Sequence, residues 1–284
     1  PFSNERADVS LVFSGEEFPE PGTERRLKEQ GHQLEMDGPS YLVHLYEADP
    51  AFPAGLNGRF HGLLTDRNRG TTTLFNDRYG MHRIYYHESK ESFYFAAEAK
   101  AILAVHPELR RMDPRSMGEF VACGCVLENR TLFSGIHVLP CAAAWTFLNG
   151  SAKEKKTYFE PREWEDQPLL DPEQYYQEIQ EIFSQNLPRY FKARERIGMS
   201  LTGGVDTRMI MAWQKSPPGS LPCYTFGGML RDCQDVLLAR HVARVCGQPH
   251  EVISIGKEFL SRFSHYSART VYLTDGCVEV GYSP

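Results

Sequence analysis

The chain has 284 residues, 41% of them hydrophobic and 24% charged, which is the composition of an ordinary globular protein long enough for two domains. Lys and Arg number 31 against 37 for Asp and Glu, giving a formal charge of −6, and no basic run is interleaved with aromatic residues, so a nucleic acid is excluded as a partner. No apolar stretch approaches the roughly 18–20 residues that cross a bilayer, and no signal-peptide pattern opens the chain. We therefore expect a cytoplasmic protein with no membrane partner.

The seven cysteines and ten histidines show no pattern typical of a metal site or a disulfide framework. The histidines include no HExxH motif and no pair at metal-ligand spacing, so each is expected to lie at the surface or in packing contacts. The cysteines are odd in number and include no CxxC pair, which predicts reduced and mostly buried thiols. They are Cys123, Cys125, Cys141, Cys223, Cys233, Cys246 and Cys277.

Residues 1–150 carry short apolar segments broken by Gly, Asn and Asp, which is typical of antiparallel strands. Thr23–Gln30 and Ser40–Glu47 instead have apolar residues at helical spacing. An α+β layered sandwich is therefore predicted for this half. Its expected strands are Val9–Phe13, Thr72–Phe75, Ile84–His87, Ser92–Ala96 and Ala143–Phe147.

Residues 151–172 are polar, charged and proline-containing without periodicity, which predicts a linker between domains. In residues 173–284 apolar runs alternate with helical patterns, which predicts βαβ units and an α/β domain with a parallel sheet. The expected order is a helix at Glu173–Tyr190, a run at Ile197–Leu201, a helix from Asp206, a run at Cys223–Phe226, a helix at Asp235–Cys246, a run at Glu251–Ile255 and a helix from Lys257.

The junction of the first run and helix in this second half, residues 202–207 (TGGVDT), is the most informative segment. Gly203 and Gly204 permit a tight turn and let backbone N–H groups approach a ligand, and the positive end of the following helix points to the same place. This arrangement favours an anion. Asp206 is suited to hold Mg²⁺ against a phosphate, and Thr202 and Thr207 add hydroxyl donors. The alternative is a plain strand-to-helix turn with Asp206 as an N-terminal charge.

The same junction resembles the PP-loop of the ATP pyrophosphatases, whose pattern is SGGxDS, with Thr202 and Thr207 in place of the two serines. The spacing matches neither GxGxxG nor GxxxxGK[ST], so a dinucleotide fold or a Walker-type loop is not indicated. The resemblance implies that residues 202–204, Asp206 and Thr207 bind ATP together with Mg²⁺.

Further motifs are similar to those of the glutamine-dependent asparagine synthetase family. In chain order they are LNGRF at 56–60, DRYG at 77–80, AEAKA at 97–101, RTLF at 130–133, FG at 226–227, ARHVA at 239–243 and HEV at 250–252. The resemblance implies an incomplete Ntn-hydrolase-like glutamine amidotransferase domain at 1–150, which releases ammonia from glutamine. It also implies the N-terminal part of an asparagine synthetase or ATP pyrophosphatase domain at 173–284, which adenylates aspartate.

The resemblance also assigns site residues. Ser14, Gly15 and Glu16 correspond to the family's glutamine-binding Asn-Gly-Glu segment. Leu201 and Phe226, at the ends of neighbouring strands, would flank the adenine or ribose of ATP. Asp235 would assist Asp206 with the metal, although a plain helix N-terminal charge is an equal reading of Asp235.

Several departures from the family pattern bear on activity. The family's catalytic nucleophile is an N-terminal Cys, whereas this chain opens at Pro1, so the catalytic residue is unassigned and we expect a fragment truncated at both ends that is inactive by itself. Ser14 replaces an Asn that donates to the oxyanion, and losing one such donor costs on the order of 10²–10³ in rate. Gly38 stands where the family has an acidic residue, with neighbouring Asp37 as a substitute.

The expected function is that of an ATP-dependent amide ligase of asparagine synthetase type, giving asparagine, AMP and pyrophosphate. Its partners would be the small molecules ATP, aspartate and glutamine or ammonia, with a homodimer left open. One alternative is a related adenylating cyclase, of the β-lactam synthetase or lasso-peptide cyclase type, with an inactive glutaminase domain. The other is a non-catalytic nucleotide-binding scaffold.

Overall fold

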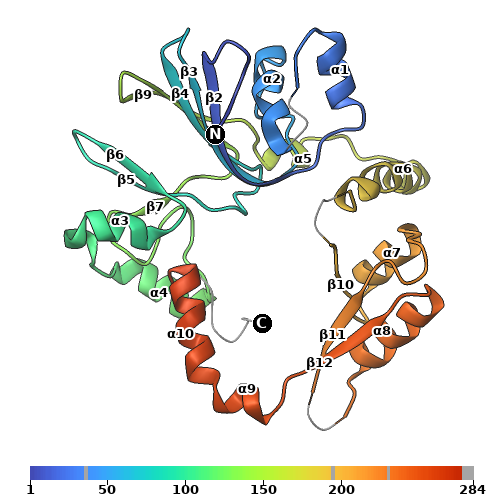
Figure 1. The fold of residues 1–284 in the computed structure, drawn as a ribbon. Coiled ribbons are helices and arrows are strands. Elements are labelled where there is room, and N and C mark those ends of the chain that lie inside the picture. The colour runs from blue at the N-terminus through green and yellow to red at the C-terminus, as the bar shows by residue number, and fades with distance from the viewer. Residues whose placement is uncertain (35–37, 193–195, 229–230, 277–284) are drawn as a thin grey trace. The chain divides into compact units, whose positions relative to one another are not determined.

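The computed structural model describes residues 1–34, 38–192, 196–228 and 231–276, and the chain forms two compact units. One unit comprises Pro1–Gln167 together with Ser267–Pro284, and the other comprises Pro168–Tyr266. The break between Gln167 and Pro168 lies inside the predicted linker, 151–172. Figure 1 shows the elements of both units.

The first unit is built on a six-stranded antiparallel sheet in the order β1-β2-β3-β4-β8-β9. Helices α1 (Thr23–Glu29) and α2 (Tyr41–Ala48) lie along it and pack through Leu27, Leu42 and Val43 into its core. Burial of these apolar side chains drives the layering, as the alternation of the strand residues predicts. The strands are β1 (Phe2–Ser3), β2 (Val9–Glu17), β3 (Gly58–Asp66), β4 (Thr71–Asn76), β8 (Ala143–Leu148) and β9 (Ser151–Thr157).

A smaller sheet in the same unit has the order β6-β5-β7 and packs against α3 (Ala99–Val105) through Tyr85, Ile102 and Ile136. Its strands are β5 (Tyr85–Glu88), β6 (Phe93–Ala96) and β7 (His137–Val138), and α4 (Pro114–Cys123) and two single 3-10 turns, Gly38–Ser40 and Pro107–Leu109, complete the unit.

The C-terminal end of α10 (Phe263–Thr274) belongs to this first unit, which differs from the predicted extent of the second domain, 173–284. The reason is a cap: the Asp275 carboxylate accepts hydrogen bonds from the backbone N–H groups of Ala99 (2.7 Å) and Lys100 (3.3 Å) at the start of α3. The Lys100 ammonium donates to the Tyr272 carbonyl at 2.9 Å. Spacing along the chain gives no sign of these contacts.

The second unit contains a parallel three-stranded sheet in the order β10-β11-β12, as the alternating pattern predicts. Leu201, Met211, Ala239 and Ala243 form its buried core with Cys223. Its elements are α6 (Pro172–Tyr190), β10 (Met199–Ser200), α7 (Val205–Trp213), β11 (Cys223–Gly227), α8 (Gln234–Val245), β12 (His250–Ser254) and α9 (Lys257–Ser261), with the short α5 (Arg162–Glu165) preceding it in the first unit.

Four strands were not expected from the sequence: the short β1 and β7, and the longer β3 and β9. Strand β3 contains Gly58 and Gly62, which weaken the strand signal, yet a Cβ at Gly62 would lie 2.4 Å from the Phe75 ring, so the fold requires glycine there. Strand β9 lies at the start of the predicted linker and is exposed along its whole length. Its three lysines suit the edge of a sheet, where charge discourages pairing with other chains.

The expectation of mostly buried cysteines is wrong for the part of the chain that the structure describes. Cys123, Cys125, Cys141 and Cys233 are exposed, and only Cys223 is fully buried, while Cys277 lies outside the described residues. Helix α4 ends at Cys123, so the chain there follows a surface turn rather than the core.

Among the described residues, no helix is long and apolar enough to cross a membrane.

Candidate functional site

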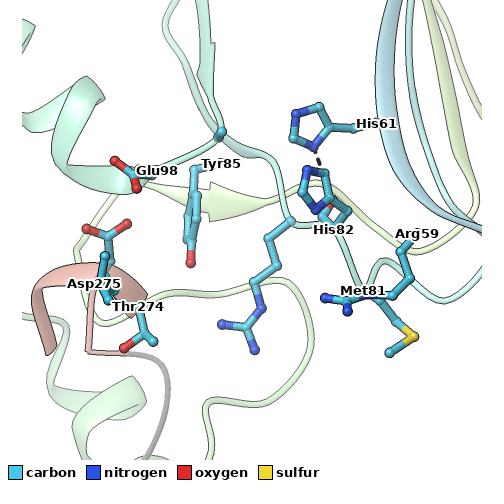
Figure 2. Close-up of a pocket in the computed structure, with 11 residues that line it drawn as sticks. Arg59, His61, Met81, His82, Tyr85, Glu98, Thr274 and Asp275 are labelled. Carbon is cyan, nitrogen blue, oxygen red and sulfur yellow. Dashed lines mark hydrogen bonds between the residues drawn. The ribbon is translucent and has the colours of Figure 1, made fainter. Parts of the chain in front are cut away.

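A cavity of about 500 Å³ opens between the large and small sheets of the first unit (Figure 2). It is lined by Arg59 and His61 of β3, the 81–83 loop, Tyr85 of β5, Ala97, Glu98 and the end of α10 at Leu273, Thr274 and Asp275. Arg59 and His61 are two residues apart on one strand, so both project from the same face. The cavity therefore collects polar side chains that are far apart in the sequence.

The charges in the cavity are separated. Figure 2 shows Arg59, His61 and His82 on one side and Glu98 with Asp275 on the other. The Lys100 ammonium lies 2.8 Å from the Glu98 carboxylate and neutralises part of the acidic side. A guanidinium facing a cavity can bind a carboxylate, so this geometry suits a small polar ligand with an acidic group.

A buried carboxylate holds the loop that carries His82 through hydrogen bonds. Asp77 is fully buried, and its oxygens accept hydrogen bonds from the backbone N–H groups of Tyr79 (3.1 Å), Met81 (3.0 Å) and His82 (2.9 Å). The Phe60 N–H on β3 donates to the same carboxylate at 3.3 Å. These bonds fasten the loop to the large sheet and fix the position of the His82 backbone.

The two cavity histidines form a stacked pair, with ring centroids 4.4 Å apart and His61 Nδ1 3.3 Å from the His82 carbonyl oxygen. Burial lowers the pKa of both imidazoles below 6.5, and for His82 the Arg59 charge lowers it further. The lowered pKa values favour the neutral form of both rings at pH 7. A neutral imidazole can accept a hydrogen bond, and His82 Nε2 lies 3.1 Å from Ser14 Oγ.

The predicted glutamine-binding residues lie beside this cavity, toward the end of β2. The register pairs Ser14 with His61, Gly15 with Phe60 and Glu16 with Arg59. A second cavity of about 170 Å³ is lined by Ser14 and shares His61 with the first. The structure thus brings these residues next to His61, His82 and Arg59, which the sequence did not single out.

Gly15 can only be glycine. Its φ is 108°, and a Cβ there would lie 2.1 Å from the Arg59 carbonyl oxygen. Gly38, where the family has an acidic residue, also has a positive φ of 71°, and the predicted substitute Asp37 lies outside the described residues. Ser14, Gly15 and Glu16 are all exposed, so a ligand can reach them.

The glycine turn of the second unit follows β10 and leads into α7. The register pairs Ser200 with Tyr224, which puts Thr202 level with Phe226 at the carboxyl ends of parallel strands, the usual ligand edge of such sheets. Phe226 is exposed at this edge. The Leu201 side chain is fully buried in the core, so only its backbone is open to a nucleotide.

The turn is held by internal hydrogen bonds. The Gly203 N–H donates to Asp235 Oδ1 at 3.0 Å, and the Gly204 N–H donates to Thr202 Oγ1 at 3.1 Å. Gly203 is needed for close approach rather than for a positive φ, because a Cβ would lie 2.8 Å from Asp235 Oδ1. Thr202 Oγ1 and Thr207 Oγ1 lie 3.2 Å apart. A phosphate that binds these two N–H groups would therefore have to displace the Asp235 carboxylate and the Thr202 hydroxyl.

The predicted metal ligands fit Mg²⁺ by chemistry. Asp206 lies in the first turn of α7, and its carboxylate has no hydrogen-bond or ion-pair partner among the described residues. The Asp235 carboxylate accepts a hydrogen bond from the Gly203 N–H in the glycine turn. Carboxylate oxygens are the ligands that Mg²⁺ takes alongside water and phosphate. Both predicted readings of Asp235 are compatible with this position, since it also lies in the first turn of α8.

Sequence reasoning missed the cavity because its lining depends on strand register. His61 would have been found opposite Ser14 had β3 been predicted, since the two strands pair directly. Asp77 is the first residue of the DRYG motif at 77–80, and His82 follows the motif by two residues, so this motif was the available signal. No motif in the sequence pointed to Asp275, because its role depends on a hydrogen bond to the start of α3.

A family profile described as "Glutamine amidotransferase domain" matches residues 1–159. The chain belongs to this family. Asparagine synthetase [glutamine-hydrolyzing] 1 of Bacillus subtilis is 21% identical over 87% of this chain and 39% of its own length. Asparagine synthetase [glutamine-hydrolyzing] 3 of the same organism is 31% identical over 49% of this chain and 23% of its own length. The resemblance to glutamine-dependent asparagine synthetases is thereby confirmed.

Amidase chyE of Penicillium rubens is 24% identical over 93% of this chain and 41% of its own length. The chain spans less than half the length of each of these curated relatives. A solved structure, the glutamine phosphoribosylpyrophosphate amidotransferase of B. subtilis with ADP and GMP, covers 92% of this chain and 52% of its own at 10% identity. Its TM-score of 0.36 is too low to support a fold assignment.

Proposed function

We propose that this chain is part of a glutamine-dependent amide ligase of the asparagine synthetase type. The observation that carries the proposal is the continuation of the chain: residues 1–159 match a glutamine amidotransferase domain, and a parallel sheet follows whose first strand runs through Gly203 and Gly204 into a helix. The first unit would release ammonia from glutamine. The second would activate the side-chain carboxylate of aspartate with ATP.

In this proposal Thr202, Gly204 and Thr207 bind the phosphates of ATP at the N-terminus of α7, where N–H groups and the helix dipole favour an anion. Asp206 and Asp235 hold Mg²⁺, which when bound neutralises charge on the leaving pyrophosphate. Phe226 is exposed at the same strand edge and gives an aromatic surface for the base or ribose. Leu201 contributes its backbone, since its side chain is buried.

On the glutamine side, Ser14 and Glu16 present polar groups at the exposed end of β2, next to Arg59. The Ser14 hydroxyl lies within hydrogen-bond distance of His82 Nε2. A hydroxyl that donates to a neutral imidazole is not free to donate to an oxyanion. This observation favours the second candidate, an adenylating enzyme whose glutaminase-type domain no longer hydrolyses glutamine.

The test is an assay of the gene product that contains this chain. AMP and pyrophosphate are measured with ATP and aspartate, and glutamine is compared with ammonium as the nitrogen source. Asparagine formed with both donors supports the proposal in full. Asparagine with ammonium alone supports the ligase and the inactive glutaminase. ATP binding without aspartate-dependent AMP would overturn the aspartate ligase in favour of another carboxylate, and absence of ATP binding would favour a scaffold.

A further inference from the structure

Three side chains able to bind a metal meet away from the cavity, where the β1–β2 hairpin approaches the helical layer. Glu5 lies in the hairpin, His32 in the loop after α1, and His44 on α2. Each offers one ligand atom, and these atoms all lie within 4.8 Å of one another. We propose that this cluster binds a divalent transition metal ion, Zn²⁺ by chemistry, with Glu47 as the fourth ligand.

The first argument is the buried imidazole of His44. His44 is 2% exposed, and within the described part of the chain its Nδ1 has no hydrogen-bond partner. This nitrogen lies 3.4 Å from Glu47 Oε2 and 3.9 Å from Glu5 Oε2. A buried polar atom without a partner is costly, and two carboxylate oxygens facing it are favourable only with positive charge between them. A bound cation supplies that charge.

The second argument is the orientation of Glu47, which lies one turn after His44 on α2. Its Oε1 accepts hydrogen bonds from Asn4 Nδ2 at 2.8 Å and Arg6 Nη2 at 3.4 Å. The other oxygen, Oε2, is left facing the imidazoles, 3.7 Å from His32 Nδ1. Metal-binding carboxylates are commonly held in this way, by hydrogen bonds to the oxygen that does not bind the metal.

Glu5 is held by the same device. Its Oε1 accepts a hydrogen bond from the Gln33 N–H at 2.8 Å, and Oε2 is the atom nearest His44 Nδ1. Two carboxylates and two imidazoles therefore converge, with each carboxylate fixed by a backbone or side-chain donor.

The ligand set indicates which ion fits. Zn²⁺ binds imidazole nitrogen and carboxylate oxygen at about 2.0–2.2 Å in a tetrahedron, which corresponds to ligand separations of about 3.3–3.5 Å. The separations from the two histidines to Glu47, 3.4 and 3.7 Å, approach this range, and that from His44 to Glu5 is 3.9 Å. Mg²⁺ and Ca²⁺ prefer oxygen ligands alone, so the imidazoles count against them.

The bound metal would tie the hairpin to the helices. Glu5 precedes β2, while His32 and His44 belong to the helical layer that covers the sheet, so one ion would add a further link between segments already joined by the Asn4–Glu47 hydrogen bond. Glu5 is exposed, which gives the ion a path from solvent. The competing reading is a set of imidazolium–carboxylate ion pairs supported by the Arg6 charge, and it requires no metal. This proposal does not depend on the proposed function.

The test is isothermal titration of the chain with Zn²⁺ after chelator treatment, together with its thermal melting. We expect one Zn²⁺ per chain, a melting temperature that rises with Zn²⁺, and the visible absorption of tetrahedral Co²⁺ when that ion is substituted. The variants His32→Gln and Glu5→Gln should each lower Zn²⁺ affinity at least tenfold. These positions are not fully buried, so the variants should fold, which circular dichroism checks.

The matched control is His106→Gln. The His106 imidazole lies 2.8 Å from the Glu108 carboxylate and so forms an imidazole–carboxylate pair outside the cluster. This variant should bind Zn²⁺ as the parent chain does. Absence of stoichiometric Zn²⁺ binding, or an affinity unchanged in His32→Gln and Glu5→Gln, would overturn the proposal and favour the ion pairs. A Co²⁺ spectrum lacking tetrahedral bands would overturn the four-ligand assignment.

Discussion

Ser14 Oγ lies 3.1 Å from His82 Nε2, which joins the end of strand β2 to the loop that precedes β5. Ser14 is a predicted glutamine-binding residue, whereas His82 was expected to be no more than a surface or packed histidine. The contact makes the chemistry of Ser14 depend on the protonation of His82. Burial and the Arg59 charge lower the pKa of that imidazole, and a neutral imidazole can accept a hydrogen bond from the hydroxyl.

The first prediction concerns the titration of His82. Its pKa should lie below 6.5 by NMR, and Ser14→Ala should raise it, because the hydroxyl that favours the neutral ring is lost. Since the unfolded chain binds the proton more readily, His82 makes folding less stable as pH falls below 6.5. The control Ser10→Ala, on the same strand, should leave the pKa of His82 unchanged. A His82 pKa at or above 6.5 in the parent chain would contradict this account.

Asp77→Ala should be strongly destabilising. The substitution removes a fully buried carboxylate that accepts hydrogen bonds from the backbone N–H groups of Phe60, Tyr79, Met81 and His82. It leaves one buried donor, the Phe60 N–H, and three part-buried donors unpaired. We expect the free energy of unfolding, measured with urea, to fall by at least about 3 kcal/mol. Asp49→Ala removes a carboxylate that, among the described residues, accepts a hydrogen bond only from the Ala51 N–H, and it should cost about 1 kcal/mol or less. Equal losses would show that the Asp77 network does not hold the loop.

Gly203→Ala tests the packing of the glycine turn against α8. The added methyl would lie 2.8 Å from Asp235 Oδ1 and 2.9 Å from Leu238 Cδ1, so the turn or the helix must shift. Overpacking of this kind costs about 1–3 kcal/mol in the free energy of unfolding. Gly256→Ala is the control, because a methyl there meets nothing within 4 Å. If both variants unfold at the same denaturant concentration, the close approach of Asp235 is wrong.

Asp206→Asn tests the proposed magnesium site. The Asp206 carboxylate has no partner among the described residues, so stability should change by no more than about 0.5 kcal/mol. Binding of a fluorescent ATP analogue in the presence of Mg²⁺ should weaken at least tenfold. The control Asp232→Asn removes a surface carboxylate paired with Arg240 and should leave binding intact. Unchanged binding in Asp206→Asn would remove this residue from the site.

The carboxylate of Glu119 should make stability depend on pH in the acid range. A hydrogen bond from Arg130 lowers its pKa from 4.5 to about 2, with further donors from Leu127 N–H and Arg115. A depressed carboxyl pKa stabilises the fold fully above pH 4.5, and this contribution is lost as pH falls toward 2. Urea denaturation between pH 6 and pH 2.5 should therefore show a smaller decline in Glu119→Gln. Identical declines in the free energy of unfolding of the parent chain and the variant would contradict the lowered pKa of Glu119.

Local pattern was sufficient for most elements of this chain. Helices α1, α2, α6, α7 and α8 and strands β2, β4, β5, β6, β8 and β11 lie within a few residues of their predicted positions, because apolar periodicity and glycine stops act within a single segment. The parallel order of β10, β11 and β12 was also expected from alternation alone. The resemblance of short ordered motifs was enough to indicate the family.

What the sequence by itself determined was therefore the class of each half, the glycine turn at Gly203–Gly204 and the family. Only the tertiary structure decided what surrounds these residues. The register of β2 on β3 set Ser14 opposite His61, and the cap of α3 by Asp275 drew the end of α10 into the first unit. Such contacts join residues far apart in the chain, and their stability comes from burial and hydrogen bonds formed only after the strands have paired, so no local pattern encodes them.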